Sequence, residues 1–407
     1  MSAVRQLRAA LSRGPIHTLP RRALLRWRYG PSKPDASYQE ALALTALRDA
    51  GRAPLREGAP PAGGSLHVAF AIPPFARGSG GHTTLSNIVR ALERRGHRCS
   101  FWLDDPGRRE LNPADAARVF KQWFGPFDAE VHPDFSAWHG ADVAVATGYQ
   151  SVLRVRTLAD CGARAYCVQD HEPDFFAASA ERVHAEESYS YGFHAITAGL
   201  WLAEVMRERY GMAATPFELA VDHDIYRPQP GARGDREVVI FYARSATPRR
   251  AVPIGLAALR ELQRRRPGVD VWLYGQADAA RVDFSFRNLG VVSGPELARA
   301  YSQATVGLSL SLTNYSLVPQ EMLACELPCV EAAEPSILAA FGTDGPVVVS
   351  KPEPHALADA IERLLADPAE RDRRARQGRE HVAPRTWDAA AERIEAGLRQ
   401  ALADRAG

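Results

Sequence analysis

The most telling stretch of this sequence runs from Thr313 to Ala333 and reads TNYSLVPQEMLACELPCVEAA. It follows the apolar run Thr305–Leu310 and ends in a second apolar run, Cys329–Ala333. Continuous apolar runs of this length are typical of strands buried on both faces of a parallel sheet. The residues between them fit a loop and a short helix over Leu317–Cys325. The stretch therefore predicts strand, loop, helix and strand within a parallel α/β sheet.

The start of that short helix is predicted to form an anion site. It lies beyond the carboxyl end of a parallel strand, where free backbone N–H groups and the positive end of the helix dipole suit a diphosphate. Tyr315, Ser316 and Leu317 stand at this start. Glu321 follows one turn later, where its carboxylate can accept hydrogen bonds from sugar hydroxyls.

Length and composition limit the classes of protein to consider. The chain has 407 residues, 46% of them hydrophobic, which is enough for two domains with separate cores. The net charge of +2 gives no argument for a nucleic-acid partner. The 5 cysteines form no CxxC or Cys/His array, as expected for small core residues in a reducing compartment. No apolar run approaches the roughly 20 residues of a membrane span, and the N-terminus lacks the apolar core of a signal peptide. A cytoplasmic protein is expected.

Strands and helices alternate along most of the chain, which predicts two doubly wound α/β domains facing each other across a cleft. Residues 65–225 are expected to form the first domain, 226–385 the second, and 386–407 a helix that returns to the first. Strands are predicted at 66–72, 98–103, 142–147, 164–168, 193–197, 237–243, 269–274, 305–310, 329–333 and 347–349. Helices are predicted at 83–95, 151–160, 199–210, 252–266, 296–303, 317–325 and 355–366, with a final one from about 386.

Residues 1–64 differ from the rest, because arginines alternate with leucines there before a linker rich in Gly and Pro. A basic amphipathic helix of this kind can rest on an anionic membrane surface. The alternatives are a solvated leader and a helix packed on the first domain.

A glycine-rich loop, Gly78-Ser-Gly-Gly-His-Thr83, separates the first predicted strand from its helix. Glycines such as Gly80 and Gly81 let the backbone approach a phosphate or a sugar closely. With Asp104 or Asp105 after the next strand, the loop is also close to a dinucleotide fingerprint, which keeps an NAD-dependent oxidoreductase or epimerase as an alternative. An NAD-dependent enzyme of this kind would leave the second domain without a role. A further alternative is that the glycine-rich loop is a tight turn that binds no ligand.

Three arginines follow the first strand of the second domain: Arg244, Arg249 and Arg250. Guanidinium groups gathered at the mouth of a cleft repel one another unless an anion lies between them, which favours a phosphate ligand. A solvated basic loop is the alternative.

Together, the 313–328 stretch and these arginines resemble the donor-binding segments of retaining glycosyltransferases of the family 4 type. The resemblance implies the GT-B fold and a metal-independent transfer of a sugar from a nucleotide diphosphate. It implies that Arg244, with Arg249 or Arg250, holds the diphosphate, and that Gly80 and Gly81 face the donor phosphates or the acceptor. The family usually has an acid where this chain has Thr313, which implies a different donor sugar. The segment Tyr166–Phe176 is similar to that of bacterial rhamnosyltransferases, which implies dTDP-L-rhamnose as the donor.

Asp170, His171 and Glu172 follow a predicted buried strand and are expected at the edge of the cleft. We expect Asp170 and His171 to act in catalysis with Arg244 and Glu321, and His82 and Glu172 to contact the acceptor; a loop acid that caps the next helix is the alternative for the Asp170 cluster. Asp222-His-Asp224 has the form of a DxD metal site, but it matches the family's interdomain segment, so no metal is expected.

The sequence thus predicts a sugar transferase that acts on a glycan or lipid-linked acceptor. UDP- and GDP-sugars remain alternative donors. A silent partner that binds nucleotide sugars without turnover also remains open.

Overall fold

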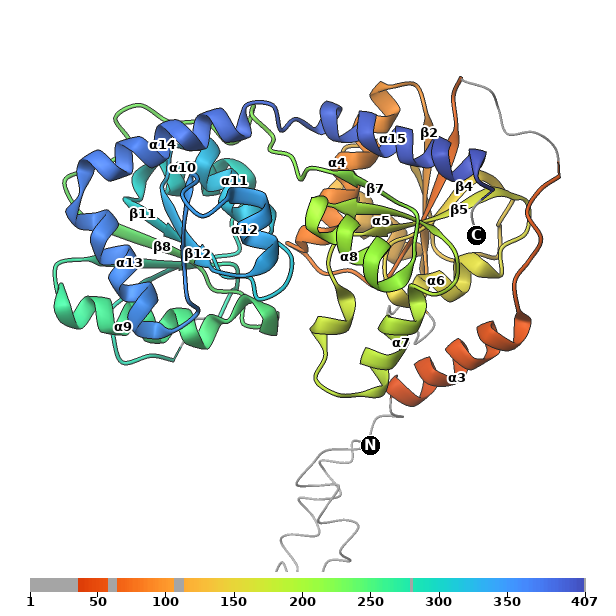
Figure 1. Cartoon of the computed structure of the whole chain (residues 1–407), viewed down its shortest axis with the longest axis horizontal. Helices are drawn as coiled ribbons and strands as arrows, with labels where there is room; N and C mark the ends of the chain where they lie inside the picture. Colours follow the sequence, from red (N-terminus) through yellow and green to blue (C-terminus); the bar gives the residue numbers. More distant parts are fainter. Residues whose placement is uncertain (1–35, 58–63, 106–112, 279–280, 406–407) are drawn as a thin grey trace, which may run out of the picture.

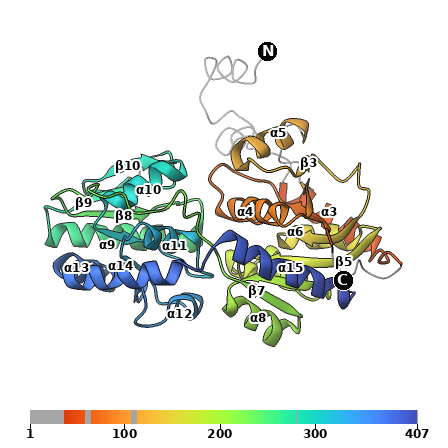
Figure 2. The same ribbon diagram turned by 90° about the horizontal axis from the view of Figure 1, so that it is seen from above.

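The computed structural model describes residues 36–57, 64–105, 113–278 and 281–405 of the chain. They form two α/β domains that lie side by side (Figures 1 and 2). The predicted basic helix falls mainly on residues 1–35, outside the described residues. After them, helix α3 (Ala36–Ala50) rests against α6 and α7, with Arg48 paired to Glu187.

The first domain is built on one parallel sheet with the strand order β3-β2-β1-β4-β5-β6-β7. Its strands are β1 (His67–Ile72), β2 (Arg98–Leu103), β3 (Glu130–His132), β4 (Ala141–Ala146), β5 (Cys161–Val168), β6 (His194–Ala198) and β7 (Ala214–Phe217). Its helices are α4 (Gly80–Arg94), α5 (Pro113–Phe124), α6 (Tyr149–Arg156), η2 (Glu172–Phe175), α7 (Ala180–Ser188) and α8 (Leu200–Tyr210). The central strands are buried along almost their whole length because helices cover both faces of the sheet.

The second domain repeats this plan with the strand order β10-β9-β8-β11-β12-β13, again all parallel. Its strands are β8 (Val238–Tyr242), β9 (Asp270–Tyr274), β10 (Arg287–Gly290), β11 (Val306–Leu308), β12 (Cys329–Ala332) and β13 (Val347–Ser350). Its helices are η3 (Pro248–Arg250), α9 (Val252–Arg265), α10 (Gly294–Gln303), α11 (Leu317–Ala324), α12 (Pro335–Phe341), α13 (Pro354–Ala366) and α14 (Pro368–Val382). The predicted pair of doubly wound domains is confirmed.

The chain crosses between the domains twice, and the crossings bond to each other through Val221 N and Arg385 O at 3.0 Å. After the second crossing, α15 (Trp387–Ala403) lies along the first domain, in contact with α4, β5, β6 and β7 (Figure 1). The first domain therefore holds both ends of the described chain, and the second domain is attached to it through these crossings.

One boundary in the first domain differs from the sequence prediction. Helix α6 ends at Arg156 and β5 begins at Cys161, whereas a helix to Asp160 and a strand from Arg164 were expected. The helix is capped by Thr157, and Asp160, with a φ of 58° in the left-handed region, turns the chain into the strand. Arg164 lies inside the strand, fully buried, and donates to the carbonyl oxygens of Val155 and Leu158 at 3.0 and 2.9 Å.

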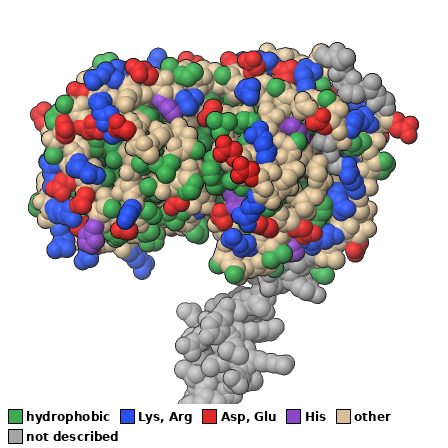
Figure 3. Space-filling model, in the orientation of Figure 1, with side chains coloured by type: hydrophobic (Ala, Val, Ile, Leu, Met, Phe, Trp, Pro, Cys, Tyr) green, Lys and Arg blue, Asp and Glu red, His purple; other side chains and the backbone are tan. Residues whose placement is uncertain are grey.

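The surface carries mixed charge. On the face seen in Figure 3, acidic and basic side chains of the described residues are interspersed over both domains. The five cysteines are all free and buried. Among the described helices, none has the length and apolar character that a membrane crossing requires.

Candidate active site

A cavity of about 820 Å³ lies between the two domains, and both contribute to its walls. The carboxyl ends of both sheets open toward it, the usual place for a ligand in α/β folds. Of the residues singled out from the sequence, these line the cavity: Gly80, Gly81, His82, Asp170, Glu172, Arg244, Arg249, Arg250, Tyr315, Ser316, Leu317 and Glu321. The structure thus brings almost all of them together from distant parts of the chain.

His171 is the exception, because it does not line the cavity. Its side chain is buried, with Nδ1 2.7 Å from Asp174 Oδ2 and Nε2 2.7 Å from the Tyr210 hydroxyl. Both ring nitrogens are therefore engaged. The residue ties its loop to α8 and has no nitrogen left for a reacting group in this arrangement.

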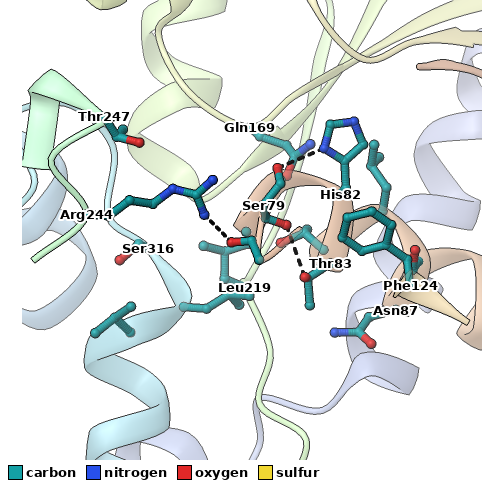
Figure 4. A pocket seen from close by; sticks show the side chains of 18 of the residues that line it. Ser79, His82, Thr83, Asn87, Phe124, Gln169, Leu219, Arg244, Thr247 and Ser316 are labelled. Atoms are coloured by element: carbon teal, nitrogen blue, oxygen red, sulfur yellow. Dashed lines mark hydrogen bonds between the residues drawn. The ribbon is translucent and has the colours of Figure 1, made fainter. Parts of the chain in front are cut away.

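The glycine loop meets the second domain directly. Arg244 Nη1 donates a hydrogen bond to the carbonyl oxygen of Gly78, across the cavity (Figure 4). Gly78 has a φ of 75°, and a Cβ there would lie 3.6 Å from Arg244 Nη1 and 3.5 Å from Val291. These are ordinary van der Waals distances, so it is the positive φ, which strains any residue with a side chain, that favours glycine at position 78.

His82 lies in the first turn of α4 and supports the loop from behind (Figure 4). Its Nδ1 is 2.8 Å from Ser79 Oγ, and Nε2 is 3.4 Å from the carbonyl oxygen of Pro73. Burial lowers the pKa of His82 to about 4. The ring is therefore neutral at pH 7, which suits a hydrogen-bonding role rather than proton donation.

Unsatisfied polar atoms gather on the second-domain side of the cavity. Arg250 Nη1 and Ser316 Oγ are buried and have no hydrogen-bond partner among the described residues. Ser316 is the residue that precedes α11, and its hydroxyl does not cap that helix. A helix start, a hydroxyl without a partner and a guanidinium are groups whose chemistry suits phosphate oxygens.

Asp170 lies where the domains touch. Its Oδ1 accepts from Asn314 N at 2.9 Å, and its Oδ2 accepts from Thr313 Oγ1 at 3.0 Å. Arg249 Nε forms an ion pair with the same Oδ2 at 3.0 Å. The carboxylate is only 7% exposed.

Two glutamates that line the cavity, Glu172 and Glu321, differ in what holds them. Glu172 accepts from Tyr149 N at 2.7 Å and from the Tyr166 hydroxyl at 2.8 Å, both within the first domain. Glu321 is half-buried on α11 and faces the cavity beside Tyr226. Burial raises the pKa of each carboxyl to about 7. Glu172 is thus committed to its own domain, whereas Glu321 is open to a ligand.

Sequence reasoning did not single out several residues that build this site. Asn314 Nδ2 donates to the carbonyl oxygens of Gln169 and Ala198, at 3.0 and 2.8 Å, and so fastens the second domain to the first. Trp123 lines the first-domain wall with its side chain 42% exposed. Asn314 lies inside the stretch from Thr313 to Ala333, but nothing in its neighbours signals a partner in the other domain. Trp123 ends an ordinary amphipathic helix.

The DxD-like pair Asp222 and Asp224 lies in the first crossing between the domains. Within the described ranges, no group of three or more His, Cys, Asp and Glu side chains is arranged to hold a metal ion. Asp222 Oδ1 instead accepts from Asp224 N at 3.1 Å, and the Asp222 carbonyl oxygen accepts from Tyr226 N at 2.8 Å, within the first crossing between the domains.

Comparisons with solved structures fix the type of fold. The chain superposes on sucrose-phosphate synthase from Thermosynechococcus elongatus with a TM-score of 0.66 and 18% identity, over 83% of this chain and 99% of that one. It superposes on Anabaena HepE, solved in complex with UDP and glucose, with a TM-score of 0.64 and 14% identity, over 82% and 100%. The chain has the GT-B fold.

Sequence comparisons agree with this GT-B fold. Residues 249–396, which include the arginines of η3 and helix α11, match the family model described as glycosyl transferase-like. The O-antigen biosynthesis protein RfbC of Myxococcus xanthus is 29% identical over 391 residues, which cover 91% of this chain. The chain spans only 29% of the length of that relative.

Proposed function

We propose that this chain is a metal-independent, retaining glycosyltransferase that moves a sugar from a nucleotide-diphosphate donor to a hydroxyl of a glycan or lipid-linked acceptor. One observation carries the proposal: Arg244, Arg250 and the start of α11 at Ser316 all border the same interdomain cavity. The match of residues 249–396 to a glycosyl transferase-like model supports it.

The chemistry follows from the charges at that point. Breaking the anomeric C–O bond builds positive charge on the sugar ring and negative charge on the departing diphosphate. The guanidinium groups and helix N–H groups stabilise the diphosphate, in the place that a metal ion takes in other designs. Both domains wall the cavity and limit the access of water, which favours transfer over hydrolysis.

The donor we propose is dTDP-L-rhamnose, for assembly of a bacterial polysaccharide in the cytoplasm, with peripheral membrane contact through the basic N-terminal part of residues 1–64. The printed name of the M. xanthus relative refers to O-antigen biosynthesis, which supports a role in polysaccharide assembly. The HepE structures contain UDP and UDP-glucose, so uridine donors are the alternative to test.

A thermal-shift panel tests the class of donor. The panel holds dTDP, UDP, GDP, the corresponding sugars and NAD at equal concentration. One nucleotide family should raise the melting temperature, because a ligand at 100 times its Kd stabilises the folded state by about 2.7 kcal/mol. A rise in melting temperature confined to UDP- or GDP-sugars would show that the donor is not dTDP-L-rhamnose but a sugar of that nucleotide. A rise in melting temperature with NAD alone would contradict the proposed transferase function and favour an NAD-dependent enzyme.

The acceptor is proposed to bind on the first-domain wall, where Trp123 offers a partly exposed aromatic face. The ring of Phe75 packs edge-on against it at a centroid distance of 5.7 Å and holds it in place. Pockets for uncharged ligands are lined by such aromatic faces and a few polar groups. Trp123→Ala should raise the acceptor KM by about tenfold, the effect of losing roughly 1.4 kcal/mol of aromatic contact. The donor KM should stay unchanged.

Initial rates at saturating donor measure the acceptor KM of Trp123→Ala. Trp123→Phe keeps an aromatic face and should recover most of the affinity. If both variants instead raise the donor KM, Trp123 faces the donor and the acceptor lies elsewhere.

A further inference from the structure

The Asp170 carboxylate, which belongs to the first domain, makes more contacts with the second domain than with its own. Three groups of the second domain reach its carboxylate: the Thr313 hydroxyl, the Asn314 amide and the Arg249 guanidinium. Among the described residues of its own domain, only His171 N donates to it, at 2.9 Å. An acid in a first-domain loop thus serves as an attachment point for the second domain.

Arg249 is fixed from two sides by the first domain. Its Nε lies 3.0 Å from Asp170 Oδ2, and its guanidinium carbon lies 3.9 Å from the centroid of the Phe175 ring. Its carbonyl oxygen accepts from Leu312 N at 3.0 Å, next to the segment that Asp170 holds. The guanidinium is therefore ion-paired through Nε and stacked on Phe175, and both interactions hold it against the first domain.

Arg250 and Arg244 differ from Arg249 in this respect. Neither forms an ion pair with a carboxylate in the part of the chain that the structure describes. Arg250 Nη1 is buried without a hydrogen-bond partner there. Arg249 Nε has no hydrogen-bond partner there either, but it contacts Asp170 as an ion pair. The Arg250 guanidinium instead lies over the Tyr242 ring, at 6.0 Å from its centroid. Arg244 bonds only to the neutral carbonyl oxygen of Gly78. Their charges remain available to an anion in the cavity.

We infer that Asp170 is a positioning residue that locks Arg249 and the 313–316 segment onto the first domain, so that Arg244 and Arg250 alone carry the donor diphosphate. The inference rests on the proposed function and narrows it. It gives Arg249 a structural role, in which it holds the two domains together, whereas the adjacent Arg250 binds the ligand.

Charge balance gives a second reason. Asp170 lines the same cavity, and an uncompensated carboxylate would repel a diphosphate. Arg249 neutralises it. The cavity then keeps Arg244 and Arg250 for a diphosphate that carries one charge on each phosphate.

The segment that Asp170 holds leads directly to the helix start. Tyr315, next along the chain, donates its hydroxyl hydrogen to Glu218 at 3.2 Å and is 3.2 Å from Leu219 N, both in the first crossing. Thr313, Asn314 and Tyr315 are thus each attached outside their own domain, and Ser316 follows. Release of Asp170 should loosen the position of Ser316 and of the α11 N–H groups.

A double-mutant cycle on ligand binding tests the inference. Titration calorimetry with the nucleoside diphosphate that responds in the thermal-shift panel gives Kd for Asp170→Asn, Arg249→Met and the double variant. Each single variant should weaken binding by about tenfold, and the double variant no further, because both remove the same attachment. Arg249→Lys keeps the charge and should restore most of the affinity. In contrast, the loss of affinity caused by Arg250→Met should multiply with the loss caused by Asp170→Asn when the two substitutions are combined.

Asp174→Asn is the matched control, because Asp174 lies in the same loop but bonds to His171 and Arg182 within the first domain. It should leave Kd close to the wild-type value. The inference is wrong if the losses of Asp170→Asn and Arg249→Met multiply, or if Arg249→Met weakens binding in the Asp170→Asn background as strongly as Arg250→Met does.

A second cycle works without any ligand. Urea unfolding of the same four proteins should show that each single variant lowers the midpoint and that the double variant lowers it no further. If wild-type protein binds no nucleotide, the proposed function fails, while this cycle still decides whether Asp170 and Arg249 act as one unit. Additive midpoint shifts would overturn the inference even where nucleotide binding is intact.

Discussion

Arg250→Ala should reduce kcat/KM for the donor by about 10²–10³, the usual cost of removing one preorganised group that stabilises developing negative charge. Arg250 lines the cavity, and its Nη1 is buried without a hydrogen-bond partner among the described residues. Among the described residues, Arg250 forms no close ion pair like that of Arg249 with Asp170, although its charge acts on the buried carboxyl of Glu331 and favours its ionised form. The departing diphosphate is therefore the partner we expect for it.

Steady-state rates with varied donor, together with donor Kd, separate binding from chemistry for this variant. A larger loss in kcat than in Kd places Arg250 on the charge that develops in the transition state. Arg236→Ala is the control, because Arg236 is an exposed arginine just before β8 whose partner is Asp270. Equal activity of Arg250→Ala and Arg236→Ala would remove Arg250 from the site and leave the anion site without its central cation.

The parallel sheets of both domains followed from the sequence because their central strands are apolar without interruption. Strands such as Val238–Tyr242 and His67–Ile72 have this pattern and were predicted to within one residue. The edge strands β3, β7 and β10 were missed, since each has only three or four residues and partly exposed side chains. Short half-exposed segments carry no periodic signal long enough to recognise.

Helices α7 and α14 were missed for a related reason. Helix α14 has few buried residues and is rich in Arg and Glu, so its stability comes from ion pairs such as Arg374 with Glu370 at 2.7 Å and from packing on α11. A helix that is polar almost all round has no apolar stripe to predict it from.

Within the site, the sequence identified the residues but not their partners. Thr313 was taken as the loss of an acid from the donor site. The structure shows that its hydroxyl donates to Asp170, so a carboxylate from the first domain stands beside this position. Asp170 and Thr313 are 143 residues apart, and no local pattern links them. Contacts between domains depend on how the two folded domains pack against each other. The hydrophobic periodicities of 2 and 3.6 residues, which predict strands and helices, carry no information about this packing.

Glu321 should make donor binding depend on pH near neutrality. Burial raises the pKa of its carboxyl to about 7 in the free protein, from an ordinary value of 4.5. Donor hydroxyls bind the carboxylate form, so protonation competes with the donor. Affinity should be constant above pH 7 and fall by about tenfold per pH unit below it. Glu321→Gln should bind the donor weakly and with no such dependence.

Donor Kd measured from pH 5.5 to 8.5 checks this expectation. A nucleotide sugar is the ligand of choice, because its diphosphate does not titrate in this range as the terminal phosphate of a free nucleotide does. Glu331 also has a raised pKa, of about 8, since it is fully buried behind the cavity. The profile of Glu331→Gln should therefore keep its midpoint near 7 if Glu321 is the group responsible.

As pH rises toward 7, the stability of the folded protein should fall while its affinity for the donor increases. Between pH 4.5 and 7 the folded protein keeps a proton on Glu321 that the unfolded chain has released, so this residue lowers stability as pH rises through that window. Above pH 7 the half-buried charge remains a cost until a donor supplies hydroxyl groups to it. Glu321→Gln removes that cost and should unfold at a higher urea concentration than wild type at pH 8, while it binds the donor less well. A variant that loses stability and keeps its affinity would mean that Glu321 holds the fold through Tyr226 and does not contact the donor.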